Sequence, residues 1–394
     1  MAQGCAGVTV PAHDNAILVL NSGSSSLKFG LFVPAANSNS PNPGEQLLFE
    51  GSADSIGRNS GSLHIRNAAG DDLLRPHHIL ESQPEALAAI LSALRDLAHT
   101  SPIAVGHRVV HGGPHLREHQ RITPELLSTL EASIHFAPLH IPQSLTLIRQ
   151  TQQALPNIPN FACFDTAFHR TLPEVAAHLP IPTRLHEAGV IRYGFHGLSC
   201  ESVVARLNPI PPRVIIAHLG NGSSITAVLN GKSVDTSMGL TPTGGIPMST
   251  RSGDLDPGVL VYLLRNEQPH AHLSADTLEQ LLNRQCGLFA FSNGESDMQA
   301  LLAREAAHEP TATLAIDAFS TAIRKTIGAY AALMGGVDLL VFTGGIGQRS
   351  APIRSRICRN LAFLGLDPNS NKVLALPSQE ELQIARHTRV LLGA

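Results

Sequence analysis

One short pattern occurs twice in this chain and constrains its fold more than any other feature. In the first copy, the apolar segment 17–20 is followed by a Gly/Ser turn and by a second apolar segment, 27–32. In the second copy, 214–218 is followed in the same way by 224–229. A strand, a glycine-containing turn and a returning strand are typical of a β-hairpin. The two copies are separated by roughly 200 residues, the size of one domain, so we expect two duplicated domains that face a shared cleft.

The length and composition are consistent with that expectation. The chain has 394 residues, too many for one ordinary core. Hydrophobic residues make up 43% and charged residues 15%, which is typical of a globular protein. Apolar residues at helical spacing predict helices over 84–99 and 311–334, the second ending at Gly335. Segment 35–44, rich in Asn, Ser and Pro, is expected to be a surface loop.

Charge and apolar patterning exclude several classes of protein. The formal net charge is −3 and no block of Lys and Arg is present, which argues against a nucleic-acid partner. No apolar run approaches the ~18 residues of a membrane span, and the start of the chain lacks the pattern of a secretory signal. The five cysteines are scattered, so neither a disulfide framework nor a thiolate zinc site is indicated. We therefore expect a cytoplasmic protein with no membrane partner.

Three glycine-rich turns follow apolar strands, at 21–26, 219–224 and 343–347. Glycine lets the backbone approach a ligand closely, and clustered N–H groups and hydroxyls bind phosphate oxygens. None of the turns has the order of a Walker A sequence. One such turn alone would be read as an ordinary hairpin. Three in one chain, with Lys28 just beyond the first, favour phosphate binding.

Several polar residues stand at the ends of apolar segments. Arg108 lies between apolar neighbours on a predicted strand, and a partly buried Arg needs an anion, either a ligand or a structural salt-bridge partner. Asp165 follows another apolar strand, and His196 lies between glycines. Arg251 lies in a long irregular stretch rich in Gly and hydroxyls, a composition often found in functional loops.

A further pattern, His107, His111, His115 and His119, would form a metal-binding face if it were helical. Gly112, Gly113 and Pro114 lie within it and would break that helix. We therefore do not predict a zinc site here.

Seven blocks of the chain carry the glycines, histidines and charged residues described above. They are 21–29, 107–113, 164–169, 193–197, 218–224, 248–254 and 342–347. Their order and residues are similar to the signature blocks of the acetate kinases, and the chain resembles that family from about residue 16 to its end.

The resemblance implies a fold shared with sugar kinases, Hsp70 and actin. This fold has two duplicated RNase H-like (actin/Hsp70-type) α/β domains, with the active site in the cleft between them. The first domain would be 1–167, completed by 382–394. The second would be 168–381, and it would carry most of the nucleotide contacts.

The resemblance also implies an activity. It is the reversible transfer of a phosphoryl group from ATP to acetate, by direct in-line transfer, giving ADP and acetyl phosphate. Mg²⁺ would be required, with Mn²⁺ as a substitute. The family is usually homodimeric.

Roles near the reacting atoms follow from the same resemblance. Asp165 would be the catalytic acid, and His196 and Arg251 would stabilise the transition state. Arg108 would hold the substrate carboxylate. The apolar pocket for a short acyl chain would be lined by Val110, Leu139, Phe195 and Pro242.

Nucleotide and metal contacts are implied as well. Asn21 and Glu380 would bind or orient the magnesium ion, and Lys28 would contact phosphates. The remaining nucleotide contacts would come from three segments: His218, Leu219, Gly220, Asn221 and Gly222 at the phosphates, Asp297, Met298 and Gln299 near the adenosine, and Gly345, Ile346 and Gly347 along it.

The chain departs from the family's usual residues at a few positions. Gln348 and Arg349 stand where the family has Glu and Asn, and Gln299 replaces an Arg. Ile141 replaces an Asn near the substrate pocket. These departures bear on nucleotide preference more than on the chemistry.

Elementary chemistry agrees with the implied roles. A carboxylate such as acetate is already ionised at neutral pH and needs little help from a base. The difficulty is the repulsion between two anions, so alignment and neutralisation by Arg108, Arg251, Lys28 and magnesium dominate. On this ground Asp165 could equally orient an Arg or the metal.

Other functions stay open at this point. Propionate kinase and a pyrophosphate-linked acetate kinase are the nearest enzymatic alternatives. A nucleotide-binding protein of the Hsp70 or actin kind, or an inactive relative, is the non-enzymatic alternative.

Overall fold

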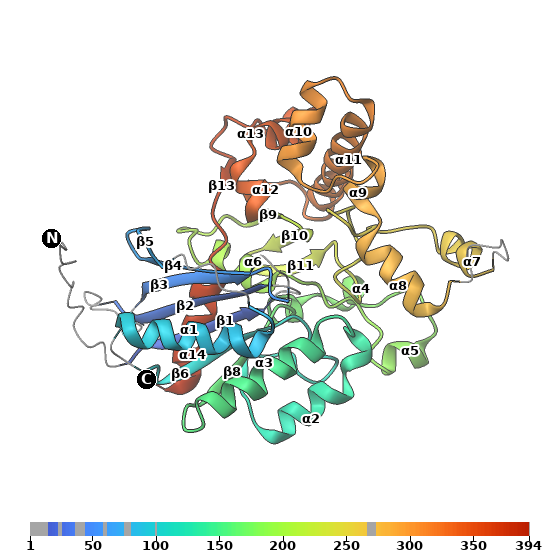
Figure 1. Cartoon of the computed structure of the whole chain (residues 1–394). Helices are drawn as coiled ribbons and strands as arrows, with labels where there is room; N and C mark the ends of the chain where they lie inside the picture. The colour runs from blue at the N-terminus through green and yellow to red at the C-terminus, as the bar shows by residue number, and fades with distance from the viewer. Residues whose placement is uncertain are drawn as a thin grey trace. The chain divides into compact units, whose positions relative to one another are not determined.

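The computed structural model describes residues 15–22, 26–35, 44–57, 61–74, 80–98, 101–265 and 273–393. The chain divides into two compact units (Figure 1). The first is Met1–Ala167 together with Glu380–Ala394, and the second is Phe168–Gln379. Each unit is built around its own β-sheet.

The first unit contains an eight-stranded sheet in the order β5-β4-β3-β2-β1-β6-β8-β7. Residues 17–21 are buried without interruption, as expected for a strand that is covered on both faces. One of these faces packs against a helix, because Leu18 and Leu20 share a core with Leu87 and Ile90. The strands are β1 (Ile17–Ser22), β2 (Ser26–Pro34), β3 (Glu45–Asp54), β4 (Ser62–Asn67), β5 (Asp72–Leu74), β6 (Ala104–Val109), β7 (Gln120–Arg121) and β8 (Asn160–Phe164).

The second unit contains a five-stranded sheet in the order β11-β10-β9-β12-β13. Its central strands are also fully buried over most of their length. The long helix α11 (Pro310–Leu333) packs on one face, where Phe319 and Ile323 join Ile215 in the core. The strands are β9 (Arg213–Leu219), β10 (Ser223–Leu229), β11 (Lys232–Thr236), β12 (Leu339–Thr343) and β13 (Val373–Ala375).

The two sheets share one strand order and one set of directions. In the first, β1 pairs antiparallel with β2 and parallel with β6, β2 pairs antiparallel with β3, and β6 pairs parallel with β8. In the second, β9 pairs antiparallel with β10 and parallel with β12, β10 pairs antiparallel with β11, and β12 pairs parallel with β13. Five strands of each unit therefore correspond one to one. The duplicated hairpins predicted from the sequence are confirmed, and so is the α/β fold class with two sheets.

The helix that follows the fifth corresponding strand lies in the other unit. Helix α14 (Glu380–Leu392) follows β13 in the chain but packs on β1, β6 and β8. Arg389 ties it there, because its buried guanidinium pairs with the buried carboxylate of Glu45 on β3. In the same way, α6 (Gly197–Val204) comes after β8 in the chain and packs on β9, where Cys200 and Val203 join the core.

The predicted helices are confirmed within a residue at each end, as α1 (Gln83–Ala98) and α11 (Pro310–Leu333). Pro310 opens α11 at a position that needs no N–H donor. The other helices of the first unit are α2 (Pro124–Ala132) and α3 (Ile141–Ala154); those of the second are α4 (Glu174–Ala177), α5 (Thr183–Glu187), α7 (Pro257–Arg265), α8 (Ala275–Arg284), α9 (Gly287–Phe291), α10 (Met298–Ala306), α12 (Gly344–Arg349) and α13 (Ala351–Cys358). Short 3₁₀ turns cover Ile134–Phe136, Ala167–Thr171 and Ala362–Leu364.

Some expectations concern residues that the structure does not describe. These are the middle of the first hairpin turn, 23–25, and most of the expected loop, 36–43. Residues 110–119 contain no helix, which confirms that the histidine run does not form a helical metal-binding face. Within the described ranges, no helix combines the length and the apolar character needed to cross a membrane.

Candidate active site

Three neighbouring strands of the first unit end at one place, and each brings a polar residue there. Asn21 lies at the end of β1, Arg108 on β6 and Asp165 directly after β8. The register of the parallel strands sets them side by side, since Leu20 pairs with His107 and Arg108 with Cys163. The carboxyl ends of such strands are where α/β sheets bind ligands.

The guanidinium of Arg108 is held mainly by Asp165. Its Nη2 donates to Oδ2 of Asp165 at 2.5 Å, and Nε donates to both carboxylate oxygens at 3.1 Å. Nη1 donates to Oδ1 of Asn21 at 3.1 Å. Burial lowers the pKa of Arg108, but the carboxylates of Asp165 and Glu380 raise it by more, so the group stays charged. The sequence predicted either a ligand or a structural salt-bridge partner for Arg108, and the salt bridge is present. A guanidinium nevertheless has more N–H donors than these bonds use.

Helix α14 adds two further carboxylates at this point. Oε2 of Glu380 lies 3.6 Å from Nη1 of Arg108, and Oε1 of Glu381 accepts from Nδ2 of Asn21 at 2.9 Å. Mg²⁺ prefers oxygen ligands and is usually held by one or two carboxylates and several waters. The donor set of Asn21, Glu380 and their acidic neighbours therefore fits this ion.

Two other predicted residues of the first unit lie on or next to strands, and a third lies between helices. Lys28 is exposed on β2 and pairs in register with Asn21 across the hairpin. Val110 follows β6 directly, and Leu139 lies in the turn before α3; both are half-buried. Ile141, where the family has Asn, is buried in the core between α2 and α3. The predicted acyl pocket also needs Phe195 and Pro242 of the second unit, so it stays a prediction.

In the second unit, two of the glycine-rich turns touch. The β9–β10 turn closes on itself, because the N–H of Gly220 donates to the carbonyl of Gly222 at 3.1 Å. Gly344 begins α12 with a φ of +76°, and a Cβ there would lie 2.6 Å from the carbonyl oxygen of Leu219. Only glycine accepts both the backbone angle and this close approach.

His196 and His218 form a stacked pair beside these turns, with ring centroids 4.2 Å apart. A serine fixes each ring through Nδ1: Ser224 for His196 at 3.0 Å and Ser199 for His218 at 2.8 Å. Both rings are more than nine-tenths buried. His196 is the N-cap residue of α6 and has a left-handed backbone (φ 58°). A non-glycine residue in this conformation is uncommon and often marks a functional site.

The side chain of Arg251 lies beside His196 and the β9–β10 turn. A Cβ built on Gly222 would lie 3.0 Å from Nη1 of Arg251 and 3.2 Å from Nε2 of His196. The turn therefore passes close to both side chains, and the absence of a side chain at Gly222 leaves room there. Nη1 of Arg251 also donates to the carbonyl of Pro242 at 3.2 Å. Within the second unit, the structure thus brings His196, Arg251 and Pro242 together with the predicted phosphate-binding turn.

His169 positions this cluster, a role that the sequence analysis missed. Its Nε2 bonds to the carbonyl of Phe195 and its Nδ1 to the hydroxyl of Ser233, both at 2.9 Å. Burial lowers the pKa of His169 to about 4, although the bond to Phe195 opposes this, so the ring is neutral at pH 7. Because a carbonyl only accepts, Nε2 carries the proton and Nδ1 accepts from Ser233. In the sequence, this role is indicated by the position of His169 in the same block as Asp165.

The residues predicted to lie near the adenosine differ in how exposed they are. Asp297 caps α10 through the N–H of Ala300, at 2.9 Å, and Gln299 is exposed beside it. Met298 is buried in the core, so a nucleotide could reach only its backbone. Gly345 is exposed, Ile346 packs against the core and Gly347 is buried. Of these residues, Gly345 offers the most open backbone, because a Cβ there would meet nothing within 4 Å.

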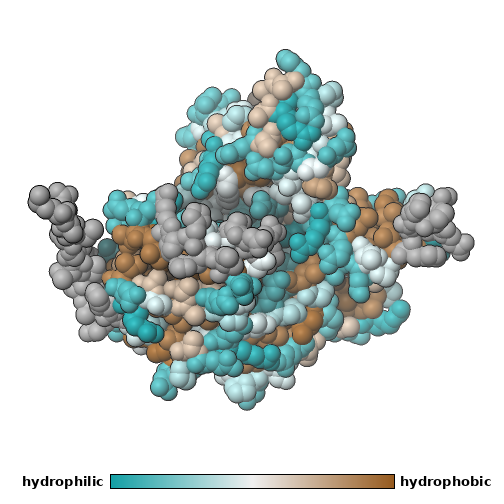
Figure 2. All heavy atoms as spheres, viewed as in Figure 1, coloured by the Kyte–Doolittle hydropathy of each residue, from teal (hydrophilic) through white to brown (hydrophobic). Residues whose placement is uncertain are grey.

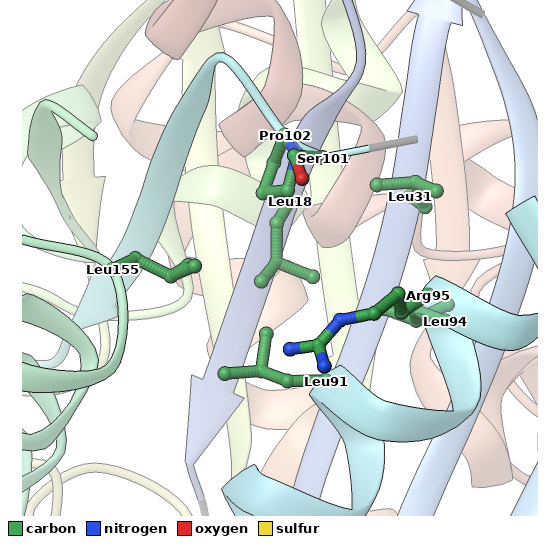
Figure 3. Close-up of a pocket in the computed structure, with 8 residues that line it drawn as sticks. All are labelled: Leu18, Leu31, Leu91, Leu94, Arg95, Ser101, Pro102 and Leu155. Atoms are coloured by element: carbon green, nitrogen blue, oxygen red, sulfur yellow. The ribbon is translucent and has the colours of Figure 1, made fainter. Parts of the chain in front are cut away.

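A small cavity between α1 and the first sheet is excluded as the site. Leucine side chains from β1, β2 and α1 and the side chain of Arg95 are among the groups that line it (Figure 3). Its volume is about 40 Å³, whereas pockets for small molecules have about 300–1,000 Å³.

The two units therefore offer complementary groups. The first presents a held guanidinium with carboxylate and amide oxygens, which suit a carboxylate ligand and a hard cation. The second presents an Arg, two histidines and glycine-rich backbone, which suit phosphate oxygens.

Comparisons with known proteins point to one family. A model of the acetokinase family matches residues 16–390. Acetate kinase from Rhodopseudomonas palustris is 39% identical over 399 residues, covering 94% of this chain and 97% of the relative. Acetate kinase from Deinococcus radiodurans is 40% identical over 405 residues, covering 95% and 98%.

Solved structures agree. A propionate kinase from Francisella tularensis superposes with a TM-score of 0.87 at 36% identity, covering 96% of this chain and all of that one. An acetate kinase from Porphyromonas gingivalis superposes with a TM-score of 0.82 at 35% identity and the same coverage.

The contact between the two glycine-rich turns can be tested on neighbouring residues. We expect Gly344→Ala to lower the free energy of unfolding by about 1–3 kcal/mol, because the new side chain adds backbone strain and meets the Leu219 carbonyl. Gly345→Ala, which meets nothing, should change it by less than about 0.5 kcal/mol. Urea denaturation of the two variants measures both, and equal effects would contradict the account.

Proposed function

Because the chain belongs to the acetokinase family, we propose that it catalyses the reversible transfer of a phosphoryl group between ATP and acetate, giving ADP and acetyl phosphate. The observation that carries the proposal is the convergence of Arg251, His196 and the β9–β10 turn in one unit. The held guanidinium of Arg108 in the other unit supports it.

The reaction brings two anions together, and this repulsion is what the protein must overcome. At neutral pH the carboxylate is already deprotonated, so its oxygen can attack the γ-phosphorus without a strong base. The bond from this oxygen to phosphorus forms as the bond to the β-phosphate oxygen breaks. Catalysis therefore consists of alignment and of neutralising the charge on the transferring group.

In the first unit, Arg108 would bind the acetate carboxylate through the N–H groups that its present bonds leave. Asp165 would orient the guanidinium rather than move a proton, because its carboxylate is buried and bonded to Arg108. Of the roles that the sequence left open for Asp165, this proposal chooses the orientation of an arginine over that of a catalytic acid. Val110 and Leu139 would contact the methyl group, together with Phe195 and Pro242.

In the second unit, Arg251 and His196 would contact oxygens of the transferring phosphoryl group. With Nδ1 of His196 accepting from Ser224, Nε2 would carry the proton and donate it in a hydrogen bond. The residues His218, Leu219, Gly220, Asn221 and Gly222 and the side chain of Lys28 would hold the nucleotide phosphates. Gly345, Ile346, Gly347, Asp297 and Gln299 would lie along the adenosine, with Met298 contributing only its backbone.

Asn21 and Glu380 would hold the magnesium ion, with Mn²⁺ as a substitute. A bound Mg²⁺ supplies positive charge to the phosphate oxygens. Their place beside Arg108 supports this assignment, because the ion and the guanidinium would then act on the same pair of anions.

Propionate is the second candidate substrate. The similarity to the solved propionate kinase supports it, and the acyl pocket that decides between the two acids is itself a proposal. Pyrophosphate in place of ATP is a further alternative, because Gln299, Gln348 and Arg349 depart from the family's usual residues on the adenosine side. We further propose that the protein acts in the cytoplasm as a homodimer.

Product trapping tests the activity. Acetyl phosphate reacts with hydroxylamine to give a hydroxamate, which is measured by its colour with iron. We expect hydroxamate only when acetate, ATP and Mg²⁺ are all present. Replacing acetate by propionate or butyrate, and ATP by GTP or pyrophosphate, ranks the alternatives. No hydroxamate with any pair of substrates would refute a carboxylate kinase.

The serine beside His196 provides a finer test. We expect Ser224→Ala to lower kcat about threefold to tenfold, because the imidazole loses the bond that fixes its tautomer and orientation. The KM for ATP should hardly change, since His196 would act on the transferring group. Ser320→Ala is the matched control, a buried serine of the same unit in the core of α11. An unchanged kcat in Ser224→Ala, or an equal loss in the control, would contradict the assignment.

A further inference from the structure

Segment 377–379, which lies between β13 and α14, is bonded at every residue to α6 or to the turn that follows it. The three bonds join the carbonyl of Pro377 to Arg206, the hydroxyl of Ser378 to Ser199, and the N–H of Gln379 to Ser202. All of these residues belong to the second unit. Hydrophilic residues are common on the face shown in Figure 2, but Ser199 and Ser202 lie in the interior, 0% and 2% exposed. Buried hydroxyls are normally hydrogen-bonded, so these bonds fix the course of the segment.

The middle bond of the three continues to an imidazole. Oγ of Ser378 donates to Oγ of Ser199 at 3.1 Å, and Oγ of Ser199 lies 2.8 Å from Nδ1 of His218 on β9. We call these three residues the serine relay. Ser202 instead bonds to backbone groups, because it donates to the carbonyl of Ser199 at 2.8 Å and accepts from Gln379. The serine relay is therefore distinct from the other bonds that anchor the segment.

The hydrogen bonds of the serine relay run in one direction. Because Ser378 donates its hydroxyl hydrogen to Ser199, the hydroxyl hydrogen of Ser199 needs an acceptor of its own. Among the residues that the structure describes, the acceptor that Oγ of Ser199 reaches is Nδ1 of His218. A buried hydroxyl without an acceptor would be costly. Nδ1 therefore accepts, and the neutral ring carries its proton on Nε2.

Nε2 of His218 lies beside the β9–β10 turn. A Cβ built on Gly220 would lie 4.0 Å from Nε2, and this turn is the proposed site of the nucleotide phosphates. With the proton on Nε2, the ring can donate a hydrogen bond to a phosphate oxygen. With the proton on Nδ1, Nε2 would present a lone pair to an anion, and the two would repel. The tautomer therefore decides whether His218 favours or opposes phosphate binding.

We propose that Ser378 is a positioning residue for nucleotide binding. Through Ser199 it holds His218 in the tautomer that donates from Nε2 to a phosphate oxygen, without touching the nucleotide itself. The inference rests on the proposed function, since it takes a nucleotide phosphate as the ligand of the turn. Removing the hydroxyl of Ser378 would admit a water, which can donate or accept. Ser199 could then turn to accept from Nδ1, and the ring would populate both tautomers.

Calorimetric titration of the full-length protein with ADP and Mg²⁺ tests the effect on binding. We expect Ser378→Ala to raise the dissociation constant for ADP about threefold to tenfold, because the ring loses its fixed tautomer and orientation. Ser378→Thr keeps the hydroxyl and should bind ADP like the wild type. Ser202→Ala is the matched control, because it removes a bond between the same segment and α6 but leaves the serine relay intact. Its dissociation constant for ADP should not change.

Steady-state kinetics separates this role from that of the neighbouring ring. Ser378→Ala should raise the KM for ATP by a similar factor and leave kcat within about twofold of the wild-type value. Ser224→Ala, which acts on His196, should show the opposite pattern, a lower kcat with an almost unchanged KM. A general loss of structure would instead lower kcat and raise KM in both variants.

Side-chain nitrogen NMR of the histidine-labelled protein observes the tautomer without relying on activity. We expect His218 in the wild type to show a protonated Nε2 and an unprotonated Nδ1, and the loss of these signals in His218→Gln identifies them. In Ser378→Ala, both nitrogen shifts should move towards those of mixed tautomers. The spectrum of Ser202→Ala should match the wild type.

Three results would overturn the proposal. A proton on Nδ1 of His218 in the wild type would reverse the direction of the serine relay. A dissociation constant for ADP that is unchanged in Ser378→Ala, or raised equally in Ser202→Ala, would reduce Ser378 to an anchoring residue. Both results would leave the proposed phosphoryl transfer standing. A wild-type protein that binds no ADP would overturn the proposed function together with the phosphate role of His218.

Discussion

The first unit depends on how one partly buried positive charge is held. The guanidinium of Arg108 lies where β1, β6 and β8 end, and a carboxylate or amide from each surrounding element faces it. A buried guanidinium without such partners would be costly, and removing one partner of a buried pair is strongly destabilising. The ion pair with Asp165 thus joins two neighbouring strands at their ends, and Glu380 brings in α14. The same arrangement gives a rigid cation with remaining N–H donors, so the contacts that stabilise the guanidinium would also position it for the proposed carboxylate ligand.

The second unit applies the same strand plan to a different chemistry. The end of β1 carries an amide beside acids, whereas the end of the corresponding strand β9 carries His218 and a glycine-rich turn. In the first unit charge is concentrated in side chains. In the second, backbone and imidazole groups lie beside Arg251. Gly344 allows the two turns to approach, and Gly222 leaves room for Arg251 and His196. A duplicated framework has thus acquired one half suited to a carboxylate and a metal, and another suited to phosphate.

Much of this could be predicted from local sequence, and the rest depends on contacts distant in the chain. The two hairpins, helices α1 and α11 and the position of Arg108 on a strand are encoded by short-range patterning, and the structure confirms them. The packing of α14 on the first unit could not be foreseen from its own residues, because it depends on a partner about 340 residues away, Glu45. The role of His169 was hidden for the same reason, since its partners lie on other segments. The family resemblance places Met298 among the nucleotide contacts together with Asp297 and Gln299, but its side chain is buried in the core of the second unit.

The central claim is that positive groups neutralise the repulsion between two anions during transfer, and Arg251 tests it most directly. Steady-state kinetics of Arg251→Ala, with Arg284→Ala as an exposed control from α8, measures kcat and the KM for ATP separately. The account predicts that kcat falls about 10²- to 10³-fold in Arg251→Ala, while the KM for ATP and both constants of the control stay near the wild-type values. Turnover of Arg251→Ala close to that of the wild type would contradict it.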